Sequence, residues 1–200
     1  MSGLILYARS RRLATTVGAI VAAVVLGATI GPAQHQLNTA SESSIPWLML
    51  LPLVLAAAIG LSIRSSMHDL DATSARALAC WRLGQIVALA VLSAAGLVLI
   101  TADLTGPFGS TAALRNLAGF LGVTLLTGRL IAGRLAWLLP SAWAFTALTL
   151  GDPAHTGLPW DWPVRHGDDV PAALTALALA ALGLLAGATG TREPRDEHRS

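Results

Sequence analysis

Apolar residues in this chain occur in long continuous runs, and the short polar segments between the runs carry most of the charge. A helix that crosses a bilayer needs about 20 mostly apolar residues, because the hydrocarbon core is about 30 Å thick and each residue advances about 1.5 Å. Six runs reach or approach this length. They are residues 13–31, 46–63, 83–102, 113–131, 135–150 and 171–190. The pattern predicts an all-α protein, a polytopic integral membrane bundle of six transmembrane helices.

The boundary between the fourth and fifth runs depends on two arginines. Arg129 and Arg134 separate the runs, and each run is slightly short for a span. A single helix over 113–150 would place both arginines near the middle of the bilayer, which is costly. Two helices joined by a tight arginine-containing turn avoid this cost, so we expect two spans.

The arginines are distributed unequally between the two sides of the predicted membrane bundle. If the chain crosses the membrane six times, eleven of the 13 fall in segments that share one side, whereas only Arg115 and Arg165 fall on the other. Five crossings would break this asymmetry. The positive-inside rule then predicts that both termini are cytoplasmic. The eleven are Arg9, Arg11, Arg12, Arg64, Arg76, Arg82, Arg129, Arg134, Arg192, Arg195 and Arg199.

This topology divides the chain into three parts. Residues 1–12 form a cytoplasmic interfacial segment, 13–190 form the six-helix transmembrane domain, and 191–200 form a cytoplasmic tail. The first apolar run follows three arginines, as in a signal peptide. It exceeds the usual apolar region of a signal peptide, however, and no clean A-x-A site follows it. We therefore expect an uncleaved anchor and a multi-pass location in the cell membrane.

The composition agrees with a membrane protein and excludes several kinds of chemistry. Hydrophobic residues make up 54% of the chain and charged residues 12%, against about 25% charged residues in a typical soluble domain. There is no lysine, so a standard Walker A loop and Schiff-base catalysis are excluded. The single cysteine, Cys80, excludes an intrachain disulfide and a cysteine cluster for zinc or iron–sulfur. We expect no cofactor, no nucleic-acid partner and no complete catalytic motif.

Residues 65–82 (SSMHDLDATSARALACWR) are the charged segment between the second and third runs. Drawn as a helix, the segment is amphipathic, with an apolar stripe that includes Leu70 and Trp81 opposite Asp69 and Arg76. Ser66 and Asp69 form an S-x-x-D start. A cytoplasmic amphipathic helix at the membrane surface is predicted. It is interpreted as a solvated surface helix, a catalytic segment or a docking surface.

The catalytic interpretation comes from Asp71-Ala-Thr-Ser-Ala-Arg76. This run resembles the start of the CDP-alcohol phosphotransferase signature, D-G-x-x-A-R, in a family that also has about six spans. The resemblance implies metal-binding aspartates further along the chain, but residues 85–95 contain no carboxylate, and Ala72 stands where the motif has glycine. A degenerate phosphotransferase-like membrane enzyme is therefore one alternative. A non-catalytic membrane scaffold or accessory protein is another.

The docking interpretation comes from Asp69-Leu-Asp71-Ala72-Thr73, then Ala77-Leu78, then Arg82-Leu-Gly84, and from the N-terminal Gly3-Leu-Ile-Leu-Tyr7-Ala-Arg9-Ser-Arg11-Arg12. These runs resemble the coupling helix and the interfacial segment of ABC-2-type ABC transporter permeases. The match covers about residues 1–90, with Ala72 in place of a glycine and the acidic spacing off by one. Beyond residue 90 only the layout matches.

The resemblance implies a membrane-spanning, permease-like subunit of an ABC exporter that moves an unknown substrate. Its partners would be a separate ABC ATPase subunit and a second permease subunit, in a homodimer or a heterodimer. The missing lysine fits such a subunit, because the nucleotide chemistry takes place in the ATPase. The residues expected to dock the ATPase are Asp69, Asp71, Arg76 and Arg82.

Residues 151–170 are the longest loop on the side opposite the termini. Trp160 and Trp162, next to two prolines, are interpreted as interfacial anchors or as part of a re-entrant element. The loop also holds acidic residues and histidines without a helical metal-ligand pair, so we expect solvated side chains and no metal site. These residues are Asp152, His155, Asp161, His166, Asp168 and Asp169.

Two further patterns concern the interior of the bundle. The predicted spans contain almost no ionisable residue, whereas proton-coupled carriers and ion pumps usually carry an acid or a histidine within the membrane. Small residues recur at four-residue spacing in the pairs Gly27–Gly31, Ala118–Gly122 and Gly183–Gly187. Such spacing allows close approach of helices, and we expect it to serve packing within the chain.

Overall fold

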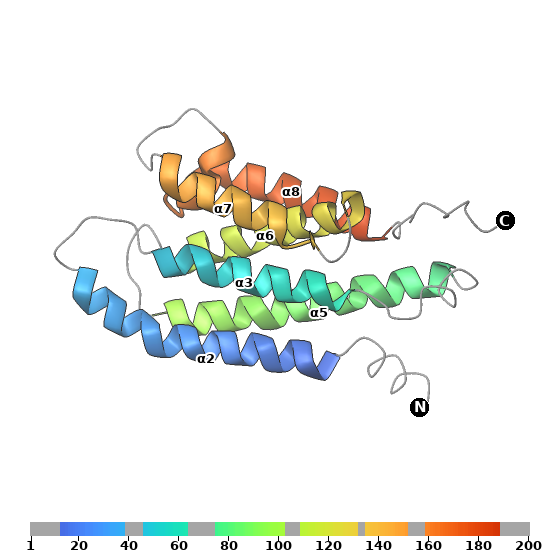
Figure 1. Cartoon of the computed structure of the whole chain (residues 1–200), viewed down its shortest axis with the longest axis horizontal. Helices are drawn as coiled ribbons and strands as arrows, with labels where there is room; N and C mark the ends of the chain where they lie inside the picture. Colours follow the sequence, from blue (N-terminus) through green and yellow to red (C-terminus); the bar gives the residue numbers. More distant parts are fainter. Residues whose placement is uncertain are drawn as a thin grey trace.

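Helices run side by side along the long axis of the molecule (Figure 1). The structure is a computed structural model that describes residues 13–38, 46–63, 75–102, 109–131, 135–151 and 159–188. These residues contain six α-helices, one 3₁₀ helix and no strand, which confirms the all-α class. The elements are α2 (Leu13–Asn38), α3 (Pro46–Ser62), α5 (Ala75–Thr101), α6 (Ser110–Leu130), α7 (Leu138–Leu150), the 3₁₀ helix η2 (Pro159–Val164) and α8 (Val170–Ala188).

Each of the six apolar runs is helical, and the break between the fourth and fifth runs is confirmed. The helix α6 ends at Leu130 and α7 begins at Leu138. One boundary differs more than the others, because α5 begins at Ala75, well before the predicted start at residue 83. Residues 75–82 of the predicted amphipathic helix are therefore the first turns of the same helix that contains the third apolar run.

Three helices are long and apolar enough to cross a membrane by length and composition. The qualifying segments are Leu13–Ile30 in α2, Cys80–Thr101 in α5 and Val170–Gly187 in α8. Two shorter apolar helical segments, Met49–Ser62 and Leu138–Leu150, lie in α3 and α7.

The helices alternate in direction along the bundle (Figure 1). The end where α2 begins, here called the proximal end, also contains the start of α5 and the end of α8. The opposite, distal end contains the end of α5 and the start of α8. The first described helix therefore begins, and the last one ends, at the same end of the molecule.

The helix α6 lies at the centre of the bundle and contacts α3, α5, α7, α8 and η2. Its polar residues Arg115, Asn116, Thr124 and Thr127 are all buried. Both threonines donate hydrogen bonds to carbonyls of their own helix four residues earlier, so they bring no unpaired hydroxyl into the core. Fully buried apolar side chains from the surrounding helices pack around α6, among them Leu55, Ile59, Ile86, Leu97 and Ala176.

The backbones of α6 and α8 lie very close to each other at Gly122 and Gly183. A Cβ added to Gly122 would lie 2.2 Å from the carbonyl oxygen of Leu179, and one added to Gly183 would lie 2.5 Å from that of Gly122. Only hydrogen fits between the two backbones here. Glycine at these positions permits the van der Waals contact that holds helices together in lipid. The predicted role of Gly122 and Gly183 in packing within the chain is confirmed.

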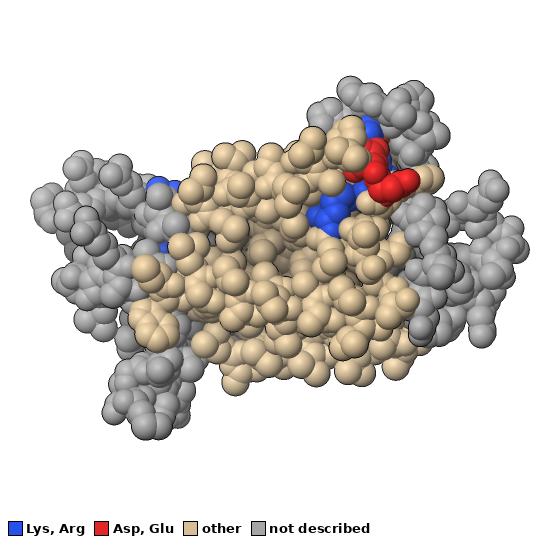
Figure 2. Space-filling view, turned by 180° about the vertical axis from the view of Figure 1, so that it is seen from behind, with Lys and Arg blue, Asp and Glu red and all other residues tan. Residues whose placement is uncertain are grey.

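The outward surface of the bundle is apolar. Leu99 is 78% exposed, and many other large aliphatic side chains also face outward. The face shown in Figure 2 is uncharged over most of its length, and its charged side chains gather towards the ends. A contiguous apolar surface of this extent is unusual for a soluble monomer and is what a lipid environment favours.

Candidate functional site

Two of the four residues predicted to dock an ATPase, Arg76 and Arg82, belong to α5, and the other two precede this helix in the sequence. Asp69 and Asp71 lie outside the described residues. Arg76 belongs to the first turn of α5, although its side chain is outside the description. Arg82 lies about two turns into α5 and is partly exposed. The predicted docking role of these residues stays a prediction.

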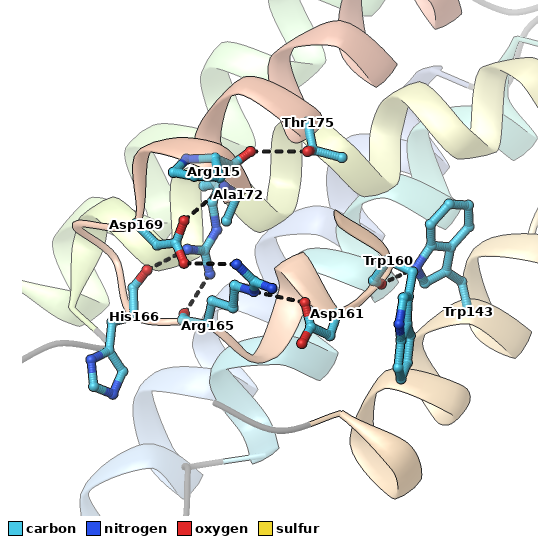
Figure 3. A network of polar contacts seen from close by, with 10 residues as sticks. Arg115, Trp143, Trp160, Asp161, Arg165, His166, Asp169, Ala172 and Thr175 are labelled. Atoms are coloured by element: carbon cyan, nitrogen blue, oxygen red, sulfur yellow. Dashed lines mark hydrogen bonds and ion pairs between the residues drawn. The ribbon is translucent and has the colours of Figure 1, made fainter. Parts of the chain in front are cut away.

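A network of described polar side chains and carbonyls lies at the distal end of the bundle (Figure 3). The participants come from the start of α6, from η2 and the turn after it, and from the start of α8. We call this group the distal cluster, and it consists of Arg115, Asn116, Asp161, Arg165, His166 and Asp169.

Arg165 is the ionic centre of the distal cluster. Its Nε donates to Asp161 Oδ1 at 2.6 Å and its Nη1 donates to Asp169 Oδ2 at 3.1 Å. Asp161, Arg165 and Asp169 follow one another at four-residue spacing, so Arg165 joins the first turn of η2 to the residue before α8. Arg165 and Asp161 are each 2% exposed. Buried charges of this kind are tolerated because they are paired and hydrogen-bonded.

The contacts of Asp169 favour its ionised form. Burial opposes ionisation of Asp169, but hydrogen bonds from the Ala172 N–H and from Arg165 lower the pKa of Asp169 below its ordinary value. Asp169 Oδ1 also accepts from the Ala172 N–H at 2.9 Å, which caps the N-terminus of α8.

Arg115 and Asn116 form hydrogen bonds with main-chain carbonyls of residues 163–166 rather than with side chains of that segment. The Arg115 guanidinium donates to the carbonyls of His166 at 2.5 Å and Arg165 at 2.7 Å. Its Nε donates to Asn116 Oδ1 at 3.2 Å, and Asn116 Nδ2 donates to the Pro163 carbonyl at 2.9 Å. Among the described residues Arg115 contacts no carboxylate directly. It serves as a multiple donor that fixes backbone geometry.

The two tryptophans of η2 have different environments. Trp160 is partly buried, and its carbonyl accepts a hydrogen bond from Trp143 Nε1 at 2.7 Å. Trp162 is fully buried, with its ring centroid 5.0 Å from that of Phe120. A Cβ added to Gly119 would lie 2.3 Å from Trp162 Cη2, so this glycine makes room for the indole.

These environments bear on the interfacial role predicted for both rings. The indole N–H of Trp162 has no acceptor among the described residues, whereas an interfacial tryptophan normally presents this group to headgroups and water. Trp162 therefore packs inside the protein. Anchoring of this segment in a membrane interface stays a prediction for Trp160 and Trp162.

The acidic side chains of the distal cluster are paired within the chain. Asp161 and Asp169 are occupied by Arg165, and Asp168 and His166 have exposed side chains. No group of three histidine, cysteine or acidic side chains among the described residues is placed to hold a metal ion. Asp152 and His155 lie outside the described residues. What the cluster does is tie α6, η2 and α8 together.

Sequence reasoning missed the parts played by Arg115, Asn116 and Arg165. The pairing of Arg165 with Asp161 and Asp169 could have been predicted from the sequence, because opposite charges at four-residue spacing can pair on one helical face. Arg115 and Asn116 carry no such signal, because their acceptors are carbonyls about 50 positions away in the chain.

Comparisons with family models, with curated proteins and with solved structures found no match to this chain. The function is therefore argued from the residues and their geometry.

Proposed function

We propose that the chain crosses the cell membrane six times with its proximal end in the cytoplasm. The described residues contain six α-helices, and these alternate in direction, which supports an even number of crossings (Figure 1). The described arginines support the orientation, because Arg82 and Arg129 lie towards the proximal end, whereas Arg115 and Arg165 lie in the distal cluster. An excess of arginine marks the cytoplasmic side of a membrane protein.

Exposed tryptophans support the same placement. Trp81 is 50% exposed near the proximal start of α5, and Trp137 is 44% exposed immediately before α7. Tryptophan is enriched where hydrocarbon meets headgroups. The two rings therefore suit the cytoplasmic membrane boundary, with the first turns of α5 extending beyond it.

We further propose that the protein is a permease-like subunit of an ABC exporter, which acts as a dimer with a separate ATPase. The observation that carries this proposal is the continuity of α5 from Ala75 to Thr101. A helix of 27 residues is about 40 Å long, about 10 Å more than the hydrocarbon core. The excess at the proximal end contains Arg76, so a partner that grips this end acts directly on a spanning helix.

The packing of α5 supports the transmission of such a force. The helix contacts α2, α3, α6 and α8. Near its proximal end, Gln85 Nε2 donates to the hydroxyl of Ser62 at 3.2 Å and to the Ser62 carbonyl at 3.3 Å, which joins α5 to the last turn of α3. A tilt of α5 would therefore move α3 with it. Closure of two ATPases would use this coupling to change which side the bundle faces.

Reversing two charges tests the proposal. The double variant Asp69→Arg/Arg76→Glu is expected to lose co-purification of the ATPase by about tenfold or more, because each charge would face a like charge on the partner. Membrane insertion and detergent elution profile are expected to stay unchanged. The matched control Arg195→Glu changes a charge in the predicted cytoplasmic tail and should leave co-purification intact. Equal recovery of the ATPase with both variants would reject the docking assignment.

A non-catalytic membrane scaffold is the second candidate function. The distal cluster favours it, because the cluster's carboxylates and guanidinium groups are used in contacts within the chain. A scaffold would have no ATPase partner, and the co-purification experiment separates the two proposals.

A further inference from the structure

We propose that residues 159–169 form a re-entrant element, which dips between α6, α7 and α8 to membrane depth and closes the distal end of the bundle. The connection from α7 to α8 would then end in an inserted segment instead of a loop in solvent. This inference rests on the chain being in a membrane, but it requires neither an ATPase partner nor a particular orientation.

The depth of the segment follows from its contacts with α7. Trp160 lies against Trp143, because its carbonyl accepts the Trp143 indole N–H. Val164 lies at the end of α7, since a Cβ on Gly151 would be 2.8 Å from Val164 Cγ2. Trp143 and Gly151 are separated by about 12 Å of helix. The described segment thus starts well below the distal end of α7 and rises beside it.

Contacts with α6 also place the segment well below the distal end of the bundle. Trp162 fills the space above Gly119 and packs on Phe120, which places the indole about 13 Å along α6 from its start at Ser110. The carbonyls of Arg165 and His166 meet Arg115, nearer that start. The segment is therefore deepest around the two tryptophans and leaves the bundle towards Asp169.

The backbone of the segment is suited to an environment without water. Irregular backbone at membrane depth is tolerated only where protein groups satisfy its polar atoms. Side chains of α6 and α7 donate to the carbonyls of four residues in the segment, and Pro159 and Pro163 have no N–H that would need an acceptor. The four carbonyls belong to Trp160, Pro163, Arg165 and His166.

The exposed side chains of α7 beside the segment also indicate that η2 lies at the depth of the acyl chains. Phe145 is 69% exposed and Leu150 is 71% exposed, and both lie on α7 between Trp143 and Gly151, the residues that η2 contacts. Large apolar side chains exposed at this level favour acyl chains over water. At 13 residues, α7 is also only about 20 Å long. The re-entrant element supplies protein beside the distal half of this short helix.

Closure is the consequence of this placement. The segment contacts α6, α7 and α8 together, and Trp162 occupies the notch at Gly119. Any passage through the distal half of the bundle along these helices has to displace η2 and break the contacts that Arg115, Asn116 and Trp143 make with its carbonyls.

Spin labelling in lipid nanodiscs measures the level of the segment. The labels are placed at Phe145→Cys, Leu150→Cys and Asp168→Cys in a Cys80→Ser background. Labels at 145 and 150 are expected to collide more with oxygen than with a water-soluble nickel chelate, and the label at 168 is expected to show the opposite. A label at 150 that prefers the nickel chelate would place η2 at the level of water and overturn the proposal.

A labelling rate in the same nanodiscs tests the insertion itself. Val164→Cys should react with a charged maleimide at least about tenfold more slowly than Asp168→Cys, because the buried site reacts only after a local opening. Denaturation should remove the difference, which shows that both thiols are intact. Equal rates in the folded protein would overturn the proposal. Both faces of a nanodisc are accessible, so neither result depends on the orientation or the exporter function proposed above.

Discussion

Replacing Gly122 with valine is expected to abolish the folded bundle. The new Cβ would lie 2.2 Å from the Leu179 carbonyl oxygen and 2.3 Å from its carbon, and both are backbone atoms that cannot move aside alone. Relief requires that α6 and α8 separate, which gives up the close contact between their backbones at Gly122 and Gly183. Overpacking of an interior typically costs about 1–3 kcal/mol, and a clash between two backbones should reach or exceed the top of that range.

Thermal unfolding and size-exclusion profiles in mild detergent measure this effect. The matched control is Gly18→Val, because a Cβ at Gly18 in α2 meets nothing within 4 Å. The control replaces the same residue type in another apolar helix and should retain a monodisperse protein with nearly unchanged stability. A folded Gly122→Val variant with the stability of the control would show that α6 and α8 do not pack as described.

Replacing Arg165 with methionine is expected to produce the second large loss. The change leaves Asp161, which is 2% exposed, without its hydrogen-bonded counter-ion. Removing one partner of a buried ion pair costs about 3 kcal/mol or more, mainly because the remaining charge stays buried and unpaired. Asp169 is affected less, because its side chain is 20% exposed and it keeps the hydrogen bond from Ala172.

A second substitution identifies the cause of that loss. The double variant Asp161→Asn/Arg165→Met removes the buried charge and should recover a large part of the stability lost in Arg165→Met, as judged by thermal unfolding in detergent. Asp168→Asn, a change at an exposed acid next to the cluster, should have little effect. A double variant no more stable than Arg165→Met would contradict an ionic role for the pair.

The sequence predicted the helices well, because runs of apolar residues carry their own signal. Six runs correspond to six helices, and the two arginines between the fourth and fifth correctly indicated a break. The start of α5 was predicted less well. Residues 75–82 have an amphipathic pattern, which is typical of a surface helix. However, no proline or glycine turn lies between Ala75 and the start of the third apolar run, so the helix continues without a break.

The interior of the bundle was harder to predict. Hydropathy indicates whether a helix as a whole suits lipid, but it does not indicate which other helices that helix contacts. The helix α6 contains Arg115, Asn116 and Arg129, yet it is the central helix of the bundle. Arg115 and Asn116 are buried because carbonyls of a distant segment accept their hydrogen bonds. The residue type of Trp162 suggested an interfacial anchor or part of a re-entrant element, and nothing in the sequence pattern indicated the space at Gly119 in which the ring is buried.

The central claim is that the bundle crosses the membrane six times with its proximal end in the cytoplasm. Single cysteines at Ser65→Cys and Thr105→Cys, each in a Cys80→Ser background, test it with a membrane-impermeant maleimide applied to intact cells. The account predicts that position 105 is labelled in intact cells and that position 65 is labelled only after lysis. Labelling of position 65 but not of position 105 in intact cells would contradict it.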